Sequence, residues 1–150
     1  MKTAIVYHSA HHGNTKKVLD AIAQQGAVTL IKADTAHIDL SAYDLIGFAS
    51  GIYFFNFHER VLQCAEKNLP HGKKVFLLYT CGVKLKRYTN AIKGIAAAKG
   101  AKLLGAYGCR GFDTFGWFGR IGGIAKGRPN EADIAGAVKF FAEISPGSGQ

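Results

Sequence analysis

The chain has 150 residues, of which 48% are hydrophobic and 19% are charged, and its formal net charge is +9. This length suits a single globular domain with one sizeable core. No apolar run is long enough for a signal-peptide core or a membrane span, which predicts a protein that stays in the cytoplasm. The cysteines Cys64, Cys81 and Cys109 are odd in number and form no Cys-x-x-Cys pair, which argues against a disulfide framework or a structural zinc site.

Five short apolar runs are nearly continuous, a pattern typical of strands that are covered on both faces of a parallel sheet. They are Ala4–Tyr7, Val28–Ile31, Leu45–Ala49, Val75–Tyr79 and Leu103–Tyr107. Apolar residues at helical spacing between and after these runs predict helices. The helices are expected around Val18–Ala23, Phe57–Leu69, Tyr88–Ala96 and Ile134–Phe141. Alternation of this kind predicts βαβ units with right-handed crossovers.

Three connections carry further predictions. Asn56, with Glu59 three residues later, predicts a capping box at the start of the second helix. The stretch from Lys32 to Asp44 predicts only a brief helix or turn. The glycine-rich connection from Gly108 to Asn130 is long enough to suggest a functional loop. We expect one domain over residues 1–144 and a flexible tail over residues 145–150.

The connection after the first strand has the composition of a phosphate-binding loop. Its residues are Ser9, Ala10, His11, His12, Gly13, Asn14 and Thr15. Backbone N–H groups at a helix N-terminus, together with the positive end of the helix dipole, bind phosphate readily. Gly13 would allow a close approach of the backbone, and Ser9 and Thr15 add hydroxyl groups. The chain contains no P-loop motif, no Gly-x-Gly-x-x-Gly after the first strand and no Gly-x-Ser-x-Gly.

The run ending in Gly13-Asn14-Thr15 resembles the flavodoxin phosphate loop, Ser/Thr-x-Thr-Gly-Asn-Thr. The resemblance extends to the segment Ser50-Gly51-Ile52-Tyr53, to the stretch from Gly111 to Asn130 and to the strand pattern of the whole chain. It implies a flavodoxin-like doubly wound α/β fold: a five-stranded parallel sheet of order 2-1-3-4-5 with helices on both faces. It also implies an FMN cofactor. His11 and His12 depart from the family pattern, because they replace hydroxyl-bearing residues.

The resemblance assigns two further loops to the flavin ring. The first holds Ser50, Gly51, Ile52, Tyr53, Phe54 and Phe55. Its aromatic rings would either stack on the flavin or pack under the long later loop, and the Gly51 carbonyl would turn toward the flavin N5 atom. The second holds Thr80, Cys81 and Gly82, which would offer backbone donors to the pyrimidine end. We expect the Cys81 thiol to be passive, because no base is evident beside it.

Two other ligand hypotheses receive little support from the sequence. His8, His11, His12 and His58 suggest a metal site, but their spacing matches no standard zinc pattern. Asp39, Asp44 and Asp113 suggest a receiver domain, which requires acidic residues where this chain carries histidines after its first strand.

The positive charge is unevenly distributed, because residues 67–112 include no Asp or Glu and ten Lys or Arg residues. This stretch is either a solvated face or a docking surface for an anionic partner. The second interpretation predicts an acidic redox partner protein, with peripheral membrane contact as a further use of the same face. Aromatic residues are not interleaved with these basic residues in the way that is typical of a nucleic-acid-binding surface. Cations near the flavin also predict a reduction potential less negative than in acidic flavodoxins.

Three functions follow from these observations. The first is electron transfer by an FMN-binding, flavodoxin-like protein. The second is a small FMN-dependent oxidoreductase of the NAD(P)H-quinone or protoporphyrinogen oxidase type. The third is a binding module without a redox role. The sequence favours the first and leaves open whether the protein is a carrier or an enzyme.

Overall fold

The computed structural model describes residues 2–9, 13–111 and 127–145. The strands are β1 (Thr3–His8), β2 (Val28–Lys32), β3 (Leu45–Tyr53), β4 (Asn56–Phe57), β5 (Lys74–Cys81) and β6 (Lys102–Arg110). The helices are α1 (Asn14–Ala23), α2 (Glu59–Asn68), the short 3₁₀ helix η1 (Lys86–Thr89), α3 (Asn90–Ala98) and α5 (Glu131–Ile144). Every predicted strand and helix is present.

The main strands lie in the order β2-β1-β3-β5-β6, and each neighbouring pair is parallel. This confirms the doubly wound fold and its predicted order 2-1-3-4-5, because β5 and β6 are the fourth and fifth of the predicted strands. The strand order reverses between β1 and β3, because β2 lies on one side of β1 and all later strands of the parallel sheet lie on the other. In this class of sheet, ligands bind beyond the carboxyl ends of the strands at such a reversal.

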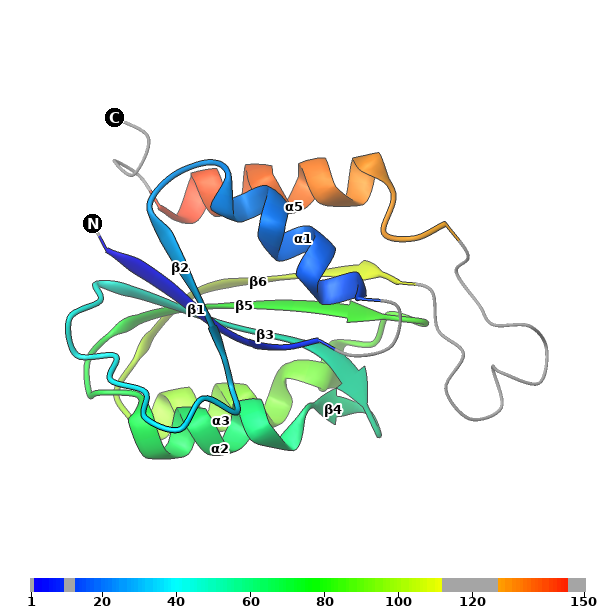
Figure 1. Ribbon diagram of the computed structural model, residues 1–150. Coiled ribbons are helices and arrows are strands. Elements are labelled where there is room, and N and C mark those ends of the chain that lie inside the picture. Colours follow the sequence, from blue (N-terminus) through cyan, green and yellow to red (C-terminus); the bar gives the residue numbers. More distant parts are fainter. Residues whose placement is uncertain (1, 10–12, 112–126, 146–150) are drawn as a thin grey trace.

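Helices α1 and α5 cover one face of the sheet, and α2 and α3 cover the other (Figure 1). Each pair of helices packs on its own cluster of buried side chains. The cluster under α2 and α3 includes Phe48, Phe57, Val61, Leu77 and Ile92. The cluster under α1 and α5 includes Ile5, Leu19, Ile22, Phe76 and Phe141. Burial on both faces explains why the strands are continuous apolar runs rather than alternating ones.

Strand β3 runs past its predicted end at Ala49 and reaches Tyr53, so the loop predicted over residues 50–56 is wrong in part. A tight turn at Phe54 and Phe55 then leads into β4, which pairs with β3 in the antiparallel sense. Both turn residues have positive φ, 50° and 67°. Hairpin turns with this backbone favour Asn and Gly, so two phenylalanines gave no sequence signal for the hairpin.

The predicted capping box of Asn56 and Glu59 is also wrong, because Asn56 belongs to the hairpin. The N-cap of α2 is His58, whose Nδ1 accepts the N–H of Arg60 at 3.1 Å. A capping box occurs instead at α5, where Asn130 and Asp133 each accept the backbone N–H of the other at 2.9 Å.

Residues 33–44 contain two short turns, at 33–34 and 41–42, and no helix. Of the predicted long connection after Gly108, residues 108–110 belong to β6, and residues 112–126 lie outside the described part of the chain, as do residues 146–150 of the predicted tail. The extent of the domain stays a prediction. Within the described ranges, no helix has the length and apolarity needed to cross a membrane.

Candidate functional site

The first turn of α1 lies at the carboxyl end of β1, where the sequence predicts a phosphate loop. Gly13 occupies the N-cap position with φ 66° and provides no side-chain cap, and the turn contains no acidic residue. The hydroxyl of Ser9 accepts the backbone N–H of Lys16 at 3.2 Å. The ammonium group of Lys16 pairs with Asp20 at 2.5 Å on the exposed side of the helix. An anion at this turn would therefore meet backbone N–H groups and hydroxyls.

Two other segments converge on the same turn. The hydroxyls of Thr15 and Thr80 are 2.9 Å apart and buried, which joins the start of α1 to the end of β5. Gly111, just after β6, passes so close to α1 that a Cβ there would lie 2.5 Å from the side-chain Nδ2 of Asn14. The N–H of Gly111 in turn donates to the carbonyl of Cys81 at 2.8 Å. The loops after β1, β5 and β6 therefore form one packed edge.

The end of β3 is held by a relay of hydrogen bonds through Ser50. The backbone N–H of His58 donates to the Ser50 hydroxyl at 2.9 Å, and that hydroxyl donates to the Gly51 carbonyl at 2.5 Å. The ring of Tyr53 folds back to within 3.5 Å of the position that a Cβ on Gly51 would take. These contacts fix the orientation of the Gly51 peptide, which the resemblance assigns to the flavin ring.

His8 and His58 stack beside this relay, with ring centroids 3.7 Å apart and an interplanar angle of 15°. Tyr53 meets both rings edge-on. Burial lowers the pKa of His8, and the neighbouring His58 lowers it further. Burial, followed by the charge of Arg60, lowers the pKa of His58. Both imidazoles are therefore biased toward the neutral form at the edge of the site.

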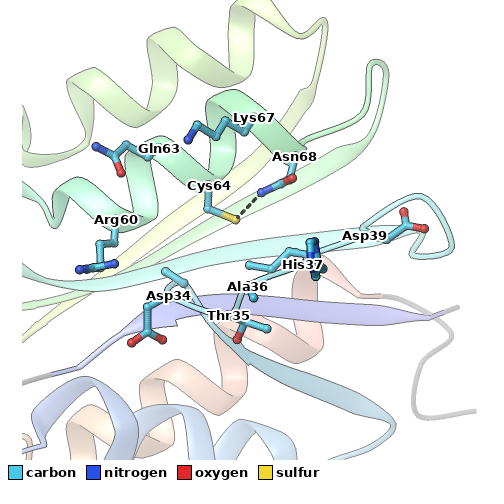
Figure 2. Close-up of a pocket in the computed structure, with 12 residues that line it drawn as sticks. Asp34, Thr35, Ala36, His37, Asp39, Arg60, Gln63, Cys64, Lys67 and Asn68 are labelled. Atoms are coloured by element: carbon cyan, nitrogen blue, oxygen red, sulfur yellow. Dashed lines mark hydrogen bonds between the residues drawn. The ribbon is translucent and has the colours of Figure 1, made fainter.

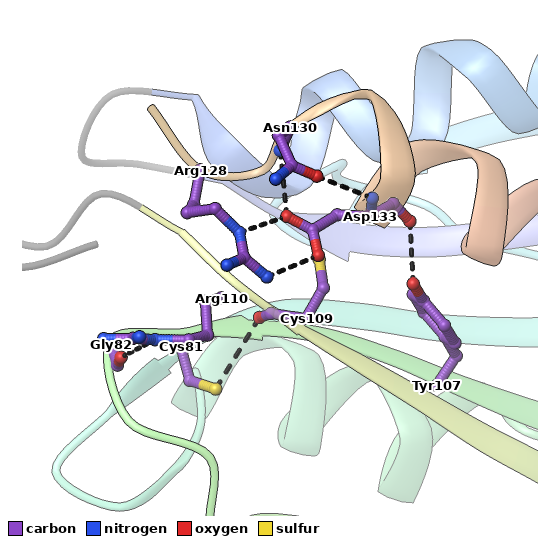
Figure 3. A network of polar contacts seen from close by, with 8 residues as sticks. All are labelled: Cys81, Gly82, Tyr107, Cys109, Arg110, Arg128, Asn130 and Asp133. Carbon is purple, nitrogen blue, oxygen red and sulfur yellow. Dashed lines mark hydrogen bonds and ion pairs between the residues drawn. The ribbon is translucent and has the colours of Figure 1, made fainter. Parts of the chain in front are cut away.

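Polar contacts join the ends of β5 and β6 to each other, and the Tyr107 hydroxyl of β6 donates to the backbone carbonyl of Asp133 in α5 at 2.7 Å (Figure 3). Arg110 donates to the carbonyl of Gly82 at 2.8 Å, and the Cys81 thiol donates to the carbonyl of Cys109 at 3.6 Å. Arg128 binds both carboxylate oxygens of Asp133, at 2.5 and 2.7 Å, and this contact lowers the pKa of Asp133.

Sequence comparison identifies the family. The family model described as a flavodoxin domain matches residues 4–116. The chain belongs to the flavodoxin family. It is 35% identical over 147 residues to the uncharacterized protein MJ0298 of Methanocaldococcus jannaschii, an alignment that covers 96% of this chain and 98% of the relative.

Solved flavodoxin structures share the fold at low sequence identity. Oxidised flavodoxin 2 of Bacillus cereus has a TM-score of 0.69 at 19% identity, covering 96% of this chain and 97% of that one. The flavodoxin of Fusobacterium nucleatum bound to flavin mononucleotide has a TM-score of 0.67 at 14% identity, covering 95% and 96%. A flavodoxin from the domain Archaea has a TM-score of 0.66 at 16% identity, covering 96% of both chains.

The flavodoxin-family site predicted from sequence maps onto one edge of the sheet. The described residues Ser9, Gly13, Asn14, Thr15, Ser50, Gly51, Ile52, Tyr53, Thr80, Cys81 and Gly82 all lie at the carboxyl ends of β1, β3 and β5. Ile52 also packs on the core beneath α2. Phe54 and Phe55 project from the hairpin turn, with 81% and 60% of their surface exposed. His11 and His12 lie outside the described residues. The contacts of these residues with a cofactor stay predictions.

Three residues at this edge have roles that the sequence did not single out. His58 supports Ser50 and Gly51, Arg110 holds the Gly82 carbonyl, and Gly111 packs on α1. Arg110 directly opposes Cys81 in the parallel pairing of β5 and β6, so a correct register would have identified it. No local signal marks His58, because its role depends on the unpredicted hairpin.

A separate groove of about 410 Å³ lies between residues 33–39 and α2 (Figure 2). Arg60, Gln63 and Lys67 line its helical side, and Asp34 and Asp39 line the opposite side. Cys64 borders it as well; the side-chain amide of Asn68 donates to its thiol at 3.5 Å, and burial raises the pKa of that thiol. None of the predicted cofactor residues that the structure describes lines this groove.

Proposed function

We propose that this flavodoxin-family chain binds FMN and transfers electrons. The phosphate would lie at the first turn of α1, and the flavin ring would lie along the ends of β3 and β5. When bound, the flavin supplies the redox chemistry, while the protein provides binding, orientation and electrostatics. The observation that carries the proposal is that the segments after β1, β5 and β6 meet at the first turn of α1, through Thr15, Thr80 and Gly111. That turn contains no acidic residue.

The residues present fit a phosphate monoester. Helix N–H groups and the helix dipole favour a negative charge at the start of α1. The hydroxyls of Ser9, Thr15 and Thr80 add polar groups that need no counter-charge. Gly13 opens the backbone there, since among the described residues no non-adjacent atom lies within 4 Å of the position that a Cβ would take. The flavin mononucleotide bound to the Fusobacterium nucleatum flavodoxin supports the choice of cofactor.

The flavin ring would be oriented mainly by backbone groups. The Ser50 hydroxyl holds the Gly51 carbonyl, and Arg110 holds the Gly82 carbonyl. Both peptides would present polar groups to the ring edge without a change in the sheet. Such preorganisation lowers the entropy cost of binding.

The experiment is an absorption and fluorescence titration of the purified, flavin-free protein with FMN. We expect a saturable shift of the flavin bands and quenched flavin fluorescence. A spectrum that stays identical to free FMN would rule out the proposed cofactor. Anaerobic addition of NADH then separates the two redox functions, because bleaching by NADH alone is expected of an oxidoreductase. A carrier stays oxidised until a separate reductase or dithionite is added.

A further inference from the structure

The hairpin turn between β3 and β4 exposes two large apolar side chains. Phe54 and Phe55 are 81% and 60% exposed. Both have positive φ, a conformation that bulky residues avoid because the Cβ meets the backbone. Strained backbone of this kind is concentrated at functional positions. The turn therefore keeps two phenylalanines in solvent at a cost to local stability.

A second segment lies against this turn and extends its apolar surface. The guanidinium of Arg87 lies 4.5 Å from the ring centre of Phe55. Val83 and Leu85, which precede η1, are 48% and 37% exposed. The Tyr88 hydroxyl donates to the Val83 carbonyl at 2.6 Å, which holds this segment in place. We call the two segments together the hairpin patch; it comprises Phe54, Phe55, Val83, Lys84, Leu85, Lys86 and Arg87.

The hairpin patch combines its apolar residues with cations alone. Lys84, Lys86 and Arg87 are exposed. Residues 67–112, which supply more than half of the patch, include no Asp or Glu. A partner that binds the hairpin patch must therefore offer negative charge to the cations and an apolar layer to the phenylalanines. A two-residue turn that projects from the sheet edge suits a soft, penetrable surface better than the flat surface of a folded protein.

We propose that the hairpin patch docks the protein on anionic phospholipid membranes. Phe54 and Phe55 enter the boundary between headgroups and acyl chains, and the three cations meet lipid phosphates. Basic residues beside an apolar tip attract anionic lipid and hold the protein at the surface without a spanning helix. Phe54 and Phe55 also belong to the predicted flavin loop, but the inference does not rest on FMN binding, because co-sedimentation measures the protein itself and not a flavin signal.

The test is co-sedimentation of the full chain with vesicles of phosphatidylcholine alone or mixed with phosphatidylglycerol, at low and at physiological salt. We expect binding to the mixed vesicles only, weakened at least several-fold by salt. The variant Lys84→Glu/Lys86→Glu should lose at least tenfold in affinity. Its matched control is Lys74→Glu/Lys102→Glu, which makes the same charge change on paired, exposed residues at the opposite end of the sheet. The control should bind nearly as the wild type does.

The variant Phe54→Asn/Phe55→Gly separates binding from folding. Asn-Gly is the preferred pair for this turn, so the urea midpoint should rise while vesicle binding is lost. The proposal is wrong if this variant binds as tightly as the wild type, or if the control variant loses as much affinity as Lys84→Glu/Lys86→Glu. It is equally wrong if the wild type stays in the supernatant with all vesicles. That outcome would favour an acidic protein as the partner of the patch.

Discussion

The hydroxyl of Thr15 lies 2.9 Å from the hydroxyl of Thr80, although the two residues are 65 positions apart in the chain. The pair is buried and lies where the predicted phosphate loop meets the predicted flavin loop. One hydroxyl must donate to the other, so each depends on its partner. The contact fixes the distance between the two halves of the proposed FMN site.

Replacing Thr80 with valine should lower both stability and FMN affinity. The change keeps the side-chain shape but leaves the Thr15 hydroxyl without this partner, which costs about 1 kcal/mol of unfolding free energy. We expect FMN affinity to fall several-fold, by about 1 kcal/mol, because the two loops lose their link. Thr29→Val on the exposed side of β2 is the control. Equal FMN affinity for Thr80→Val and the wild type would show that the pair is irrelevant to the site.

Gly13 and Gly72 form a matched pair for testing the phosphate loop. Their φ values are 66° and 77°, and at neither residue does a non-adjacent atom of the described part of the chain lie within 4 Å of the position that a Cβ would take. Replacing either with alanine should cost about 1 kcal/mol of stability, because alanine disfavours positive φ. Only Gly13→Ala should also weaken FMN binding, since Gly72 lies in the turn before β5. Similar FMN dissociation constants for the two variants, measured by fluorescence quenching, would contradict the placement of the phosphate.

The stacked imidazoles of His8 and His58 predict a dependence of stability on pH. Both pKa values are lowered in the folded chain from the ordinary value of 6.5. The unfolded chain therefore binds more protons below pH 6.5, so stability falls as the pH drops through 6.5. The loss levels off below the folded-state pKa values, where both states are protonated. Well above pH 6.5 both histidines are neutral in the folded and the unfolded chain, so they do not change the pH dependence of stability.

The variant His58→Asn isolates this effect, because asparagine can still accept the Arg60 N–H at the N-cap. Urea unfolding at pH 8 and at pH 5.5 should show a smaller loss for the variant than for the wild type. An identical loss would mean that the pair does not titrate as described.

The basic segment beside the site should raise the reduction potential of a bound flavin. Reduction adds negative charge to the flavin, and cations stabilise that charge. Changing Lys84, Lys86 and Arg87 to glutamine should make the potential more negative by about 20–40 mV, for an interaction of about 0.5–1 kcal/mol. Potentiometric titration measures the shift. The control variant Lys74→Gln/Lys102→Gln, at the far end of the sheet, should have the wild-type potential. If the triple variant also keeps the wild-type potential, the basic segment does not influence the flavin.

Continuous apolar runs predicted all five parallel strands, because both faces of this sheet are covered. The central strands β1, β3 and β5 are mostly buried, whereas Thr29 and Leu103 on the edge strands are exposed. The predicted phosphate loop begins a helix, as the Gly13-Asn14-Thr15 pattern indicates. The hairpin at Phe54 and Phe55 carries no turn signature, so the sequence did not predict it. Because Asn56 belongs to the hairpin, the N-cap of α2 is His58 and not the predicted Asn56.

Long-range contacts of the site were beyond a local pattern. The pairing of Thr15 with Thr80 and the approach of Gly111 to Asn14 arise from the register of distant strands. A single sequence specifies which residues end each strand, but not how the ends are offset. For the same reason Arg110 was recognised as part of a basic stretch and not as the side chain that holds the Gly82 carbonyl.

The most direct test of the central claim compares FMN with riboflavin, which shares the ring but lacks the phosphate. Both are titrated into the flavin-free wild type and into Gly13→Ala. The phosphate site at the start of α1 predicts that FMN binds at least a hundredfold more tightly than riboflavin, about 3 kcal/mol. The substitution should weaken FMN more than riboflavin. Equal affinities of the wild type for the two flavins would contradict the account.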